Sequence, residues 1–196
     1  MKKIIILLLI LSPSFNAFAG FSKYNPLSIA EYDRETGFYF TSVTIKEKGG
    51  FLEGTNTKPI DIYIFFPSIN EGKYLFDQKN NDEIVAFVYE SYFDESENSI
   101  IFNVMKGSNP IFQIGSNLIK NDYNITKRKL RNKLLISTYN KEKETYSLWT
   151  SNKKGEQLKK VIDFKAFDEW HIDVKNSKLR IVKQRDLKIT IENIDW

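Results

Sequence analysis

The clearest indication of the fold is the segment KLLISTYNKEKETYSLWTSNKKGEQLKKV, residues 133–161. Three runs rich in aliphatic, aromatic and β-branched residues, 133–139, 145–151 and 157–164, are separated by short polar stretches. The second stretch contains Asn152 and Gly155, residue types that commonly end strands and form turns. Three such runs joined by two short connections predict two successive hairpins, and therefore an antiparallel meander.

Outward from this segment, the chain continues as short β-like runs between Gly, Asn, Asp and Lys clusters. Some runs alternate, as Leu187, Ile189 and Ile191 do with polar residues between them, which predicts strands with one face in solvent. Others, 60–66 and 84–89, are apolar on both faces, which predicts strands covered on both sides. Helical periodicity is missing except at 118–130. The predicted fold is all-β, with further strands at 38–45, 60–66, 84–92, 99–105, 110–114, 170–175, 179–183 and 187–191.

Pairs of these runs form four hairpin units, whose spacing is close to the length of a four-stranded propeller blade. Within the third unit, YSLWTSNKKGEQLKKV (146–161) resembles the blade motif of TolB-like periplasmic β-propellers, in which a strand ending in Asn, a Gly turn and a last strand recur. The stretch IYIFFPSINEGKYLF (62–76) is similar, although the usual Ser-Pro-Asp-Gly turn is absent. The resemblance implies a small or partial β-propeller built of blade-like hairpin units. An irregular β-sandwich or barrel is the alternative, because it would give the same spacing.

The N-terminus has the pattern of a cleaved signal peptide, which we assign to residues 1–19. Lys2 and Lys3 precede an apolar run, and Ala17-Phe18-Ala19 supplies the small-x-small cleavage pattern. Residues 20–36 are predicted to be an N-terminal segment with one short helical turn near 27–32, and residues 37–196 a single β domain. The expected location is periplasmic or secreted. A lipoprotein anchor is excluded because the chain has no cysteine.

Composition excludes several classes of site. Without cysteine there is no disulfide, thiolate metal site or cysteine nucleophile. Once the signal peptide is removed, 27 basic side chains face 25 acidic ones. This near balance gives no general affinity for nucleic acid or anionic membranes, and we expect no nucleic-acid partner. No motif for a cofactor is present, so we expect none.

The candidate catalytic and metal-binding residues are few. His171, the only histidine, shares a strand face with Asp173, but no nucleophile motif surrounds it, so we interpret it as a surface histidine. The acidic cluster 94–97 is interpreted as a solvated hairpin loop. The oxygen-rich stretch 77–83 lacks the glycine and the alternating ligands of calcium loops.

Basic charge is densest at 127–133, and Lys159 and Lys160 add more. Export argues against nucleic acid as the partner, which leaves a solvated basic loop or a surface that docks on an acidic protein. The candidate partner-binding surface is Lys127, Arg128, Lys129, Arg131, Trp149, Lys153 and Lys154.

The C-terminal Trp196 is of a type that often ends membrane-embedded strands. The alternate residues before it, Ile194, Glu192, Thr190 and Lys188, include a single apolar side chain, so we expect no membrane insertion.

Together these features predict an exported, soluble protein-binding module without catalytic activity. Immunity proteins that neutralise toxins delivered between bacteria, or envelope-interaction proteins, are the analogous class. The alternative is a carboxylate-based hydrolase acting on a cell-envelope polymer, because such an enzyme needs only two suitably placed carboxylates. The sequence does not determine the oligomeric state.

Overall fold

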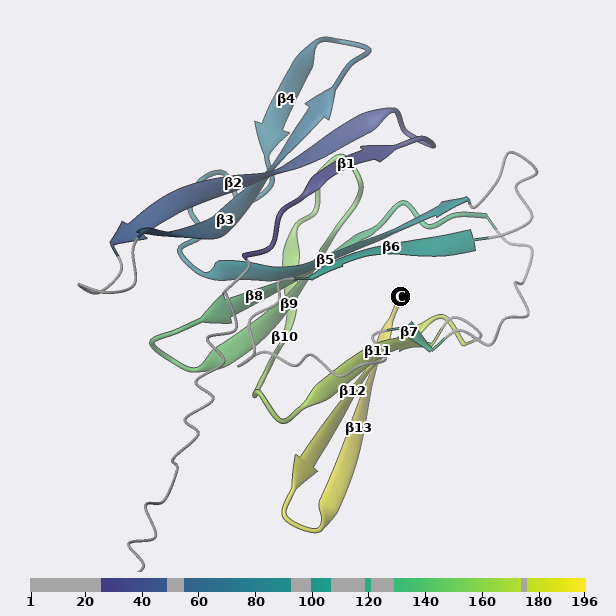
Figure 1. The fold of residues 1–196 in the computed structure, drawn as a ribbon. Helices are drawn as coiled ribbons and strands as arrows, with labels where there is room; N and C mark the ends of the chain where they lie inside the picture. Colours follow the sequence, from purple (N-terminus) through teal and green to yellow (C-terminus); the bar gives the residue numbers. More distant parts are fainter. Residues whose placement is uncertain (1–25, 49–54, 93–99, 107–118, 121–128, 174–175) are drawn as a thin grey trace, which may run out of the picture.

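The computed structural model describes residues 26–48, 55–92, 100–106, 119–120, 129–173 and 176–196, and Figure 1 shows that these form strands in three sheets without a helix. The prediction of an all-β fold is confirmed. All three sheets are open, and all but one of the strand pairings are antiparallel.

The N-terminal sheet is a simple meander in the order β1-β2-β3-β4. Its strands are β1 (Ala30–Asp33), β2 (Phe38–Lys48), β3 (Thr55–Phe66) and β4 (Glu71–Tyr74). The expected helical turn near 27–32 is wrong, because β1 pairs with β2 in this stretch and Ile29 is buried beneath it. Regular structure therefore begins before residue 37, and part of the 20–36 segment belongs to the β domain.

The central sheet has the order β10-β9-β8-β5-β6. Its strands are β5 (Glu83–Tyr92), β6 (Ile100–Lys106), β8 (Leu134–Asn140), β9 (Thr145–Ser151) and β10 (Lys159–Phe164). The two hairpins predicted for 133–161 are confirmed as β8–β9 and β9–β10. The meander is interrupted where β5 lies beside β8, strands that are distant along the chain.

The C-terminal sheet has the order β13-β12-β11-β7. Its strands are β7 (Ile119–Lys120), β11 (Glu169–Asp173), β12 (Lys178–Arg185) and β13 (Lys188–Asp195). Strand β7 pairs with β11 in parallel, which departs from the predicted meander and from the helical interpretation of 118–130 at these two residues. The predicted strand at 110–114 lies outside the described residues.

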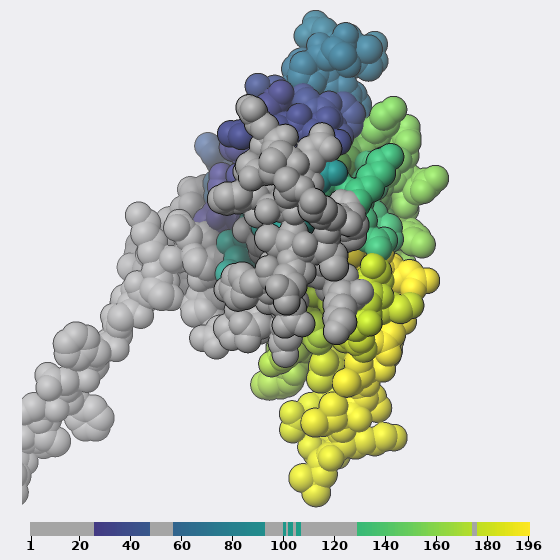
Figure 2. Space-filling model, turned by 90° about the vertical axis from the view of Figure 1, so that its right-hand side faces the viewer, coloured from purple at the N-terminus to yellow at the C-terminus, as the bar shows by residue number. Residues whose placement is uncertain are grey.

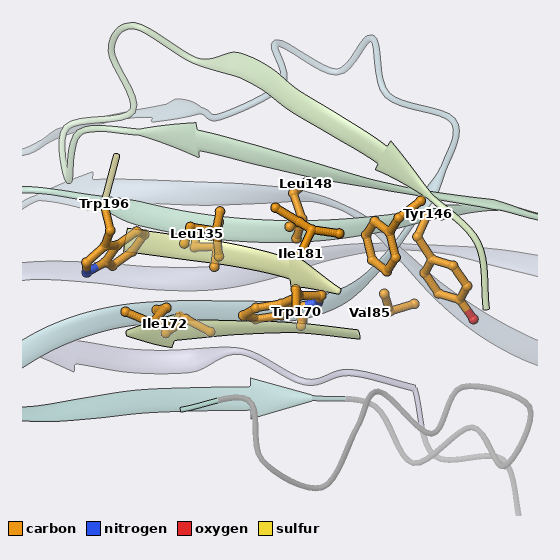
Figure 3. Packing of buried hydrophobic residues seen from close by; sticks show 12 residues of the cluster. Val85, Leu135, Tyr146, Leu148, Trp170, Ile172, Ile181 and Trp196 are labelled. Carbon is orange, nitrogen blue, oxygen red and sulfur yellow. The ribbon is translucent and has the colours of Figure 1, made fainter. Parts of the chain in front are cut away.

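The central sheet is the middle layer and carries a hydrophobic core on each face (Figure 1). Towards the C-terminal sheet it buries Val85, Leu135 and Leu148 against Trp170 and Ile181, as Figure 3 shows. The opposite face packs on the N-terminal sheet through Ile84, Phe87, Tyr89, Leu134 and Ile136. The prediction that 84–89 is covered on both sides is confirmed.

Two apolar stretches are less covered than their sequences predict. In 60–66, Ile62 and Ile64 are fully buried, but Tyr63, Phe65 and Phe66 on the same strand are only partly covered. The apolar side of 187–191 does not face the core at all. Leu187, Ile189 and Ile191 are 103, 62 and 53 % exposed, because the β12–β13 hairpin extends beyond the central sheet.

Candidate protein-binding surface

The turn between β9 and β10 fixes the position of the candidate surface. Asn152 closes it on both sides, since its side chain accepts a hydrogen bond from the Glu156 amide (2.8 Å) and donates one to the Glu156 carboxylate (2.8 Å). Gly155 has a φ of 71°, in the left-handed region that favours glycine. The Gly155 carbonyl accepts a hydrogen bond from Lys73 Nζ at 3.0 Å, which ties this turn to the N-terminal sheet.

Lys153, which the sequence placed on an exposed surface, is buried inside the protein. Its side chain is 2 % exposed, and Nζ lies 2.8 Å from Asp33 Oδ2 and 2.8 Å from the carbonyl oxygen of Glu90. The ring of Tyr89 lies 5.5 Å away. This prediction is therefore wrong, because a buried ammonium group needs partners and Lys153 finds them 120 and 63 residues away. Lys153 joins the N-terminal and central sheets.

Glu90 extends this buried polar cluster to the C-terminal sheet. One carboxylate oxygen accepts a hydrogen bond from Trp196 Nε1 at 3.0 Å, and the other accepts one from the Arg131 amide at 3.0 Å. Trp196 is 2 % exposed, so its side chain lies in the core. We call Asp33, Glu90, Lys153 and Trp196 the buried cluster. It connects all three sheets and supports the surface above it.

Next to this cluster is a cavity of about 390 Å³ at the edge of the central sheet, which we call the basic pocket. Lys133, Lys159 and Lys160 line it, together with Ile194 and Asp195 from β13. Lys133 Nζ lies over the Trp196 ring at 5.7 Å and donates to the Asp195 carbonyl at 3.4 Å. Strand β10 and the residue just before β8 thus bring three lysines together, and the end of β13 lines the same cavity.

The positive charge of the basic pocket is only partly compensated. Burial, and after it the neighbouring charges of Arg131 and Lys159, lower the pKa of Lys133 below its usual value. Lys160 pairs with Asp163 at 3.0 Å. Lys159 has no ion-pair partner among the residues that the structure describes. The pocket is therefore suited to a carboxylate-rich partner.

Trp149 borders the same region. Its Nε1 donates to Thr138 Oγ1 at 3.0 Å, its ring packs edge-on to Phe76, and Lys160 Nζ lies 5.8 Å from the ring centroid. Such a tryptophan is held rigidly and carries a cation above it. Its position, half-buried beside a lysine, suits an aromatic anchor in an interface.

Of the other predicted surface residues, Lys129 and Lys154 are exposed and Arg131 is half-buried. Lys127 and Arg128 lie outside the described residues. The predicted set omitted Lys133, Lys159 and Lys160, although all three stand in basic stretches of the sequence. Only the pairing of β8 with β9 and of β9 with β10 brings these stretches together.

The other candidate sites have structural roles. His171 is half-buried on β11 and lies opposite Arg180, while Asp173 pairs with Arg180 at 2.7 Å. Hydrogen bonds from Asn176, and then the Arg180 guanidinium, hold the pKa of Asp173 at about 2. In the stretch 77–83, Asp77 pairs with Lys79 at 2.5 Å. The acidic cluster 94–97 lies outside the described residues, and the described part of the chain holds no group of three metal-ligating side chains.

A second, larger cavity of about 860 Å³ lies beside the hydrophobic core between the central and C-terminal sheets, away from the basic pocket. Tyr139, Glu144, Phe167 and Arg185 are among its lining residues. Glu83 pairs with Tyr139 across β5 and β8, and burial raises the pKa of Glu83 to about 7. A carboxyl group with this pKa is partly protonated near neutral pH and can donate a proton.

Among the residues that the structure describes, no helix is long and apolar enough to cross a membrane. No family model matches the chain, and neither a curated protein nor a solved structure matches it.

Proposed function

We propose that the protein is an exported protein-binding module that docks an acidic partner on the basic pocket. The observation that carries this proposal is the meeting of Lys133, Lys159 and Lys160 around one cavity, with Lys159 lacking an acidic partner in the described structure. Positive charge that the fold gathers and only partly neutralises is available to a partner. It would speed encounter and select an acidic surface.

Two further features support a binding role. Trp149 supplies an aromatic side chain beside the lysines, and aromatic residues dominate the energetics of protein interfaces. The buried cluster beneath the pocket holds the three sheets together, so the surface is preorganised and little entropy is lost when a partner binds. The export pattern of residues 1–19 predicts that the proposed interaction occurs in the periplasm or outside the cell, where an immunity-type or envelope-interaction role would operate.

The test is affinity capture with tagged residues 20–196 from an envelope extract of the source organism, at low salt. The informative variant is Lys159→Glu/Lys160→Glu, which reverses two exposed charges at the pocket. Lys46→Glu/Lys106→Glu is the matched control, since it changes the net charge equally at exposed positions on β2 and β6. We expect one partner at near-equal amounts with the natural chain and the control, and its loss with the pocket variant. Equal recovery on all three would refute the proposed surface.

A carboxylate-based hydrolase acting on an envelope polymer is the second candidate function. The geometry that favours it is the cavity of about 860 Å³, whose lining includes Glu144 and Tyr139, the cross-strand neighbour of Glu83. Burial raises the pKa of Glu83 to about 7, as a general acid requires near neutral pH. A Glu83→Gln variant that folds normally would then lose hydrolysis of cell-envelope polymers. Unchanged activity in that variant, or no hydrolysis by the natural chain, would remove this candidate.

We also propose that the resemblance to TolB-like blades reflects a partial propeller. Both similar stretches, 62–76 and 146–161, form hairpins whose last strand, β4 or β10, lies at a sheet edge. An experimental structure of residues 20–196 would test this. Three sheets that fan out about a common axis would support the proposal, and sheets that share no such axis would refute it.

A further inference from the structure

Strand β13 is a regular edge strand with neither a bulge nor a proline to block further pairing. It pairs with β12 through eight consecutive residues with no bulge, contains no proline, and its other side faces no described strand. All its residues except Ile194 are exposed. Figure 2 shows the tip of this hairpin, in yellow, extending beyond the rest of the molecule. A long, regular edge of this kind offers unpaired backbone groups to another strand.

The same strand carries exposed apolar side chains. Ile189 and Ile191 are 62 and 53 % exposed, and they lie on one face beside Val182 of β12. On the opposite face, Lys188, Thr190 and Glu192 alternate with them. An edge that is both apolar and unpaired is suited to strand addition by a partner, in which backbone hydrogen bonds form and side chains pack on each face.

The charged residues of β13 indicate which strand pairs with its free edge. In an antiparallel pair, two opposite residues either both point their N–H and C=O groups at the partner strand or both point them away. These directions alternate along a strand. Two copies of β13 can therefore pair symmetrically only when the two-fold axis passes through a residue that lies opposite itself. A register centred on Thr190 places Lys188 opposite Glu192 and Ile189 opposite Ile191, each twice. Registers centred on Lys188 or Glu192 set like charges against each other. Those centred on Ile189 or Ile191 leave Lys188 opposite an uncharged residue.

We infer that the protein forms a two-fold symmetric dimer in which β13 pairs with β13 of a second copy, centred on Thr190. The C-terminal sheets of the two copies become one continuous sheet. The isoleucines of both copies form one apolar cluster on one face. On the other face, Glu192 already accepts a hydrogen bond from Lys183 at 2.6 Å, while Lys188 has no ion-pair partner among the described residues. In the dimer, Lys188 of the second copy lies opposite Glu192 and can form an ion pair with it.

This interface does not depend on the proposed binding function, and its test is separate. Sedimentation of residues 20–196 over a range of concentrations should show a reversible monomer–dimer equilibrium. Lys188→Glu and Glu192→Lys should each weaken the dimer about tenfold or more, because each turns two attractive cross-strand pairs into repulsive ones. Lys46→Glu, an exposed change on β2, should leave the dimer unchanged. Circular dichroism of each variant checks that it is folded.

Mixing the two single variants gives the decisive result. A heterodimer of the Lys188→Glu and Glu192→Lys chains has opposite charges at both pairs, so the mixture should dimerise about tenfold or more tightly than either variant alone. A natural chain that stays monomeric at every soluble concentration would overturn the inference. So would variants that dimerise as well as the natural chain, or a mixture that remains monomeric.

Discussion

Replacing Lys153 with methionine should strongly destabilise the protein. The side chain keeps its length and apolar stem but loses the ammonium group, which leaves the Asp33 carboxylate buried without its 2.8 Å partner. Removing one partner of a buried ion pair costs about 3–5 kcal/mol. For a chain of this size each kcal/mol lowers Tm by about 2–4 °C, so the expected decrease in Tm is about 6–20 °C.

The assay is urea unfolding of residues 20–196, followed by tryptophan fluorescence and circular dichroism. Lys154→Met is the control, because Lys154 lies next to Lys153 in the same turn but is exposed, and its replacement should change the free energy of unfolding by less than about 0.5 kcal/mol. Adding Asp33→Asn to Lys153→Met removes the buried charge and should restore part of the loss. A Lys153→Met protein within about 1 kcal/mol of the natural chain would show that the buried pair does not hold the sheets together.

Three further changes test other parts of the structure. Gly155→Ala should lower the free energy of unfolding by about 1–3 kcal/mol, since φ is 71° and the new Cβ would lie 2.8 Å from Ile64 Cδ1; unchanged urea midpoints would contradict this. Glu83→Gln should raise Tm at pH 8 but not at pH 4.5. Burial raises the pKa of Glu83 to about 7 in the folded state, so the natural chain loses stability as the pH rises through that value, and glutamine removes this loss. An equal shift in Tm at both pH values would be inconsistent with a buried carboxylate. Trp196→Phe keeps an aromatic ring but removes the hydrogen bond to Glu90, and should cost about 1–3 kcal/mol in thermal unfolding, whereas no loss would exclude a structural role for that bond.

The hairpins and the covered strand could be predicted because they depend on residues that are close together in the sequence. Alternation and turn residues predicted the β8–β9 and β9–β10 hairpins, and the apolar run at 84–89 predicted a strand covered on both faces. Short strands that pair through few residues were missed. β1 has four residues and β7 has two, and neither has a pattern distinct from a loop.

Long-range contacts were not predictable from one sequence. Lys153 and Lys154 stand side by side in the same turn, and nothing local distinguishes them, yet Lys153 is buried and Lys154 is exposed. The difference depends on Asp33, which is 120 residues away. The exposure of Ile189 and Ile191 could not be predicted from the sequence either, because alternation identifies the apolar face of a strand without showing whether another element covers that face.

The central claim is that the basic pocket binds an acidic partner, and the most direct measurement is the affinity of the captured partner for residues 20–196 at increasing salt. Because exposed charges are screened by salt, the affinity of the natural chain should fall steadily as salt is added, and the Lys159→Glu/Lys160→Glu variant should bind weakly at every concentration. An affinity that is independent of salt, or equal for the natural chain and the variant, would contradict the account.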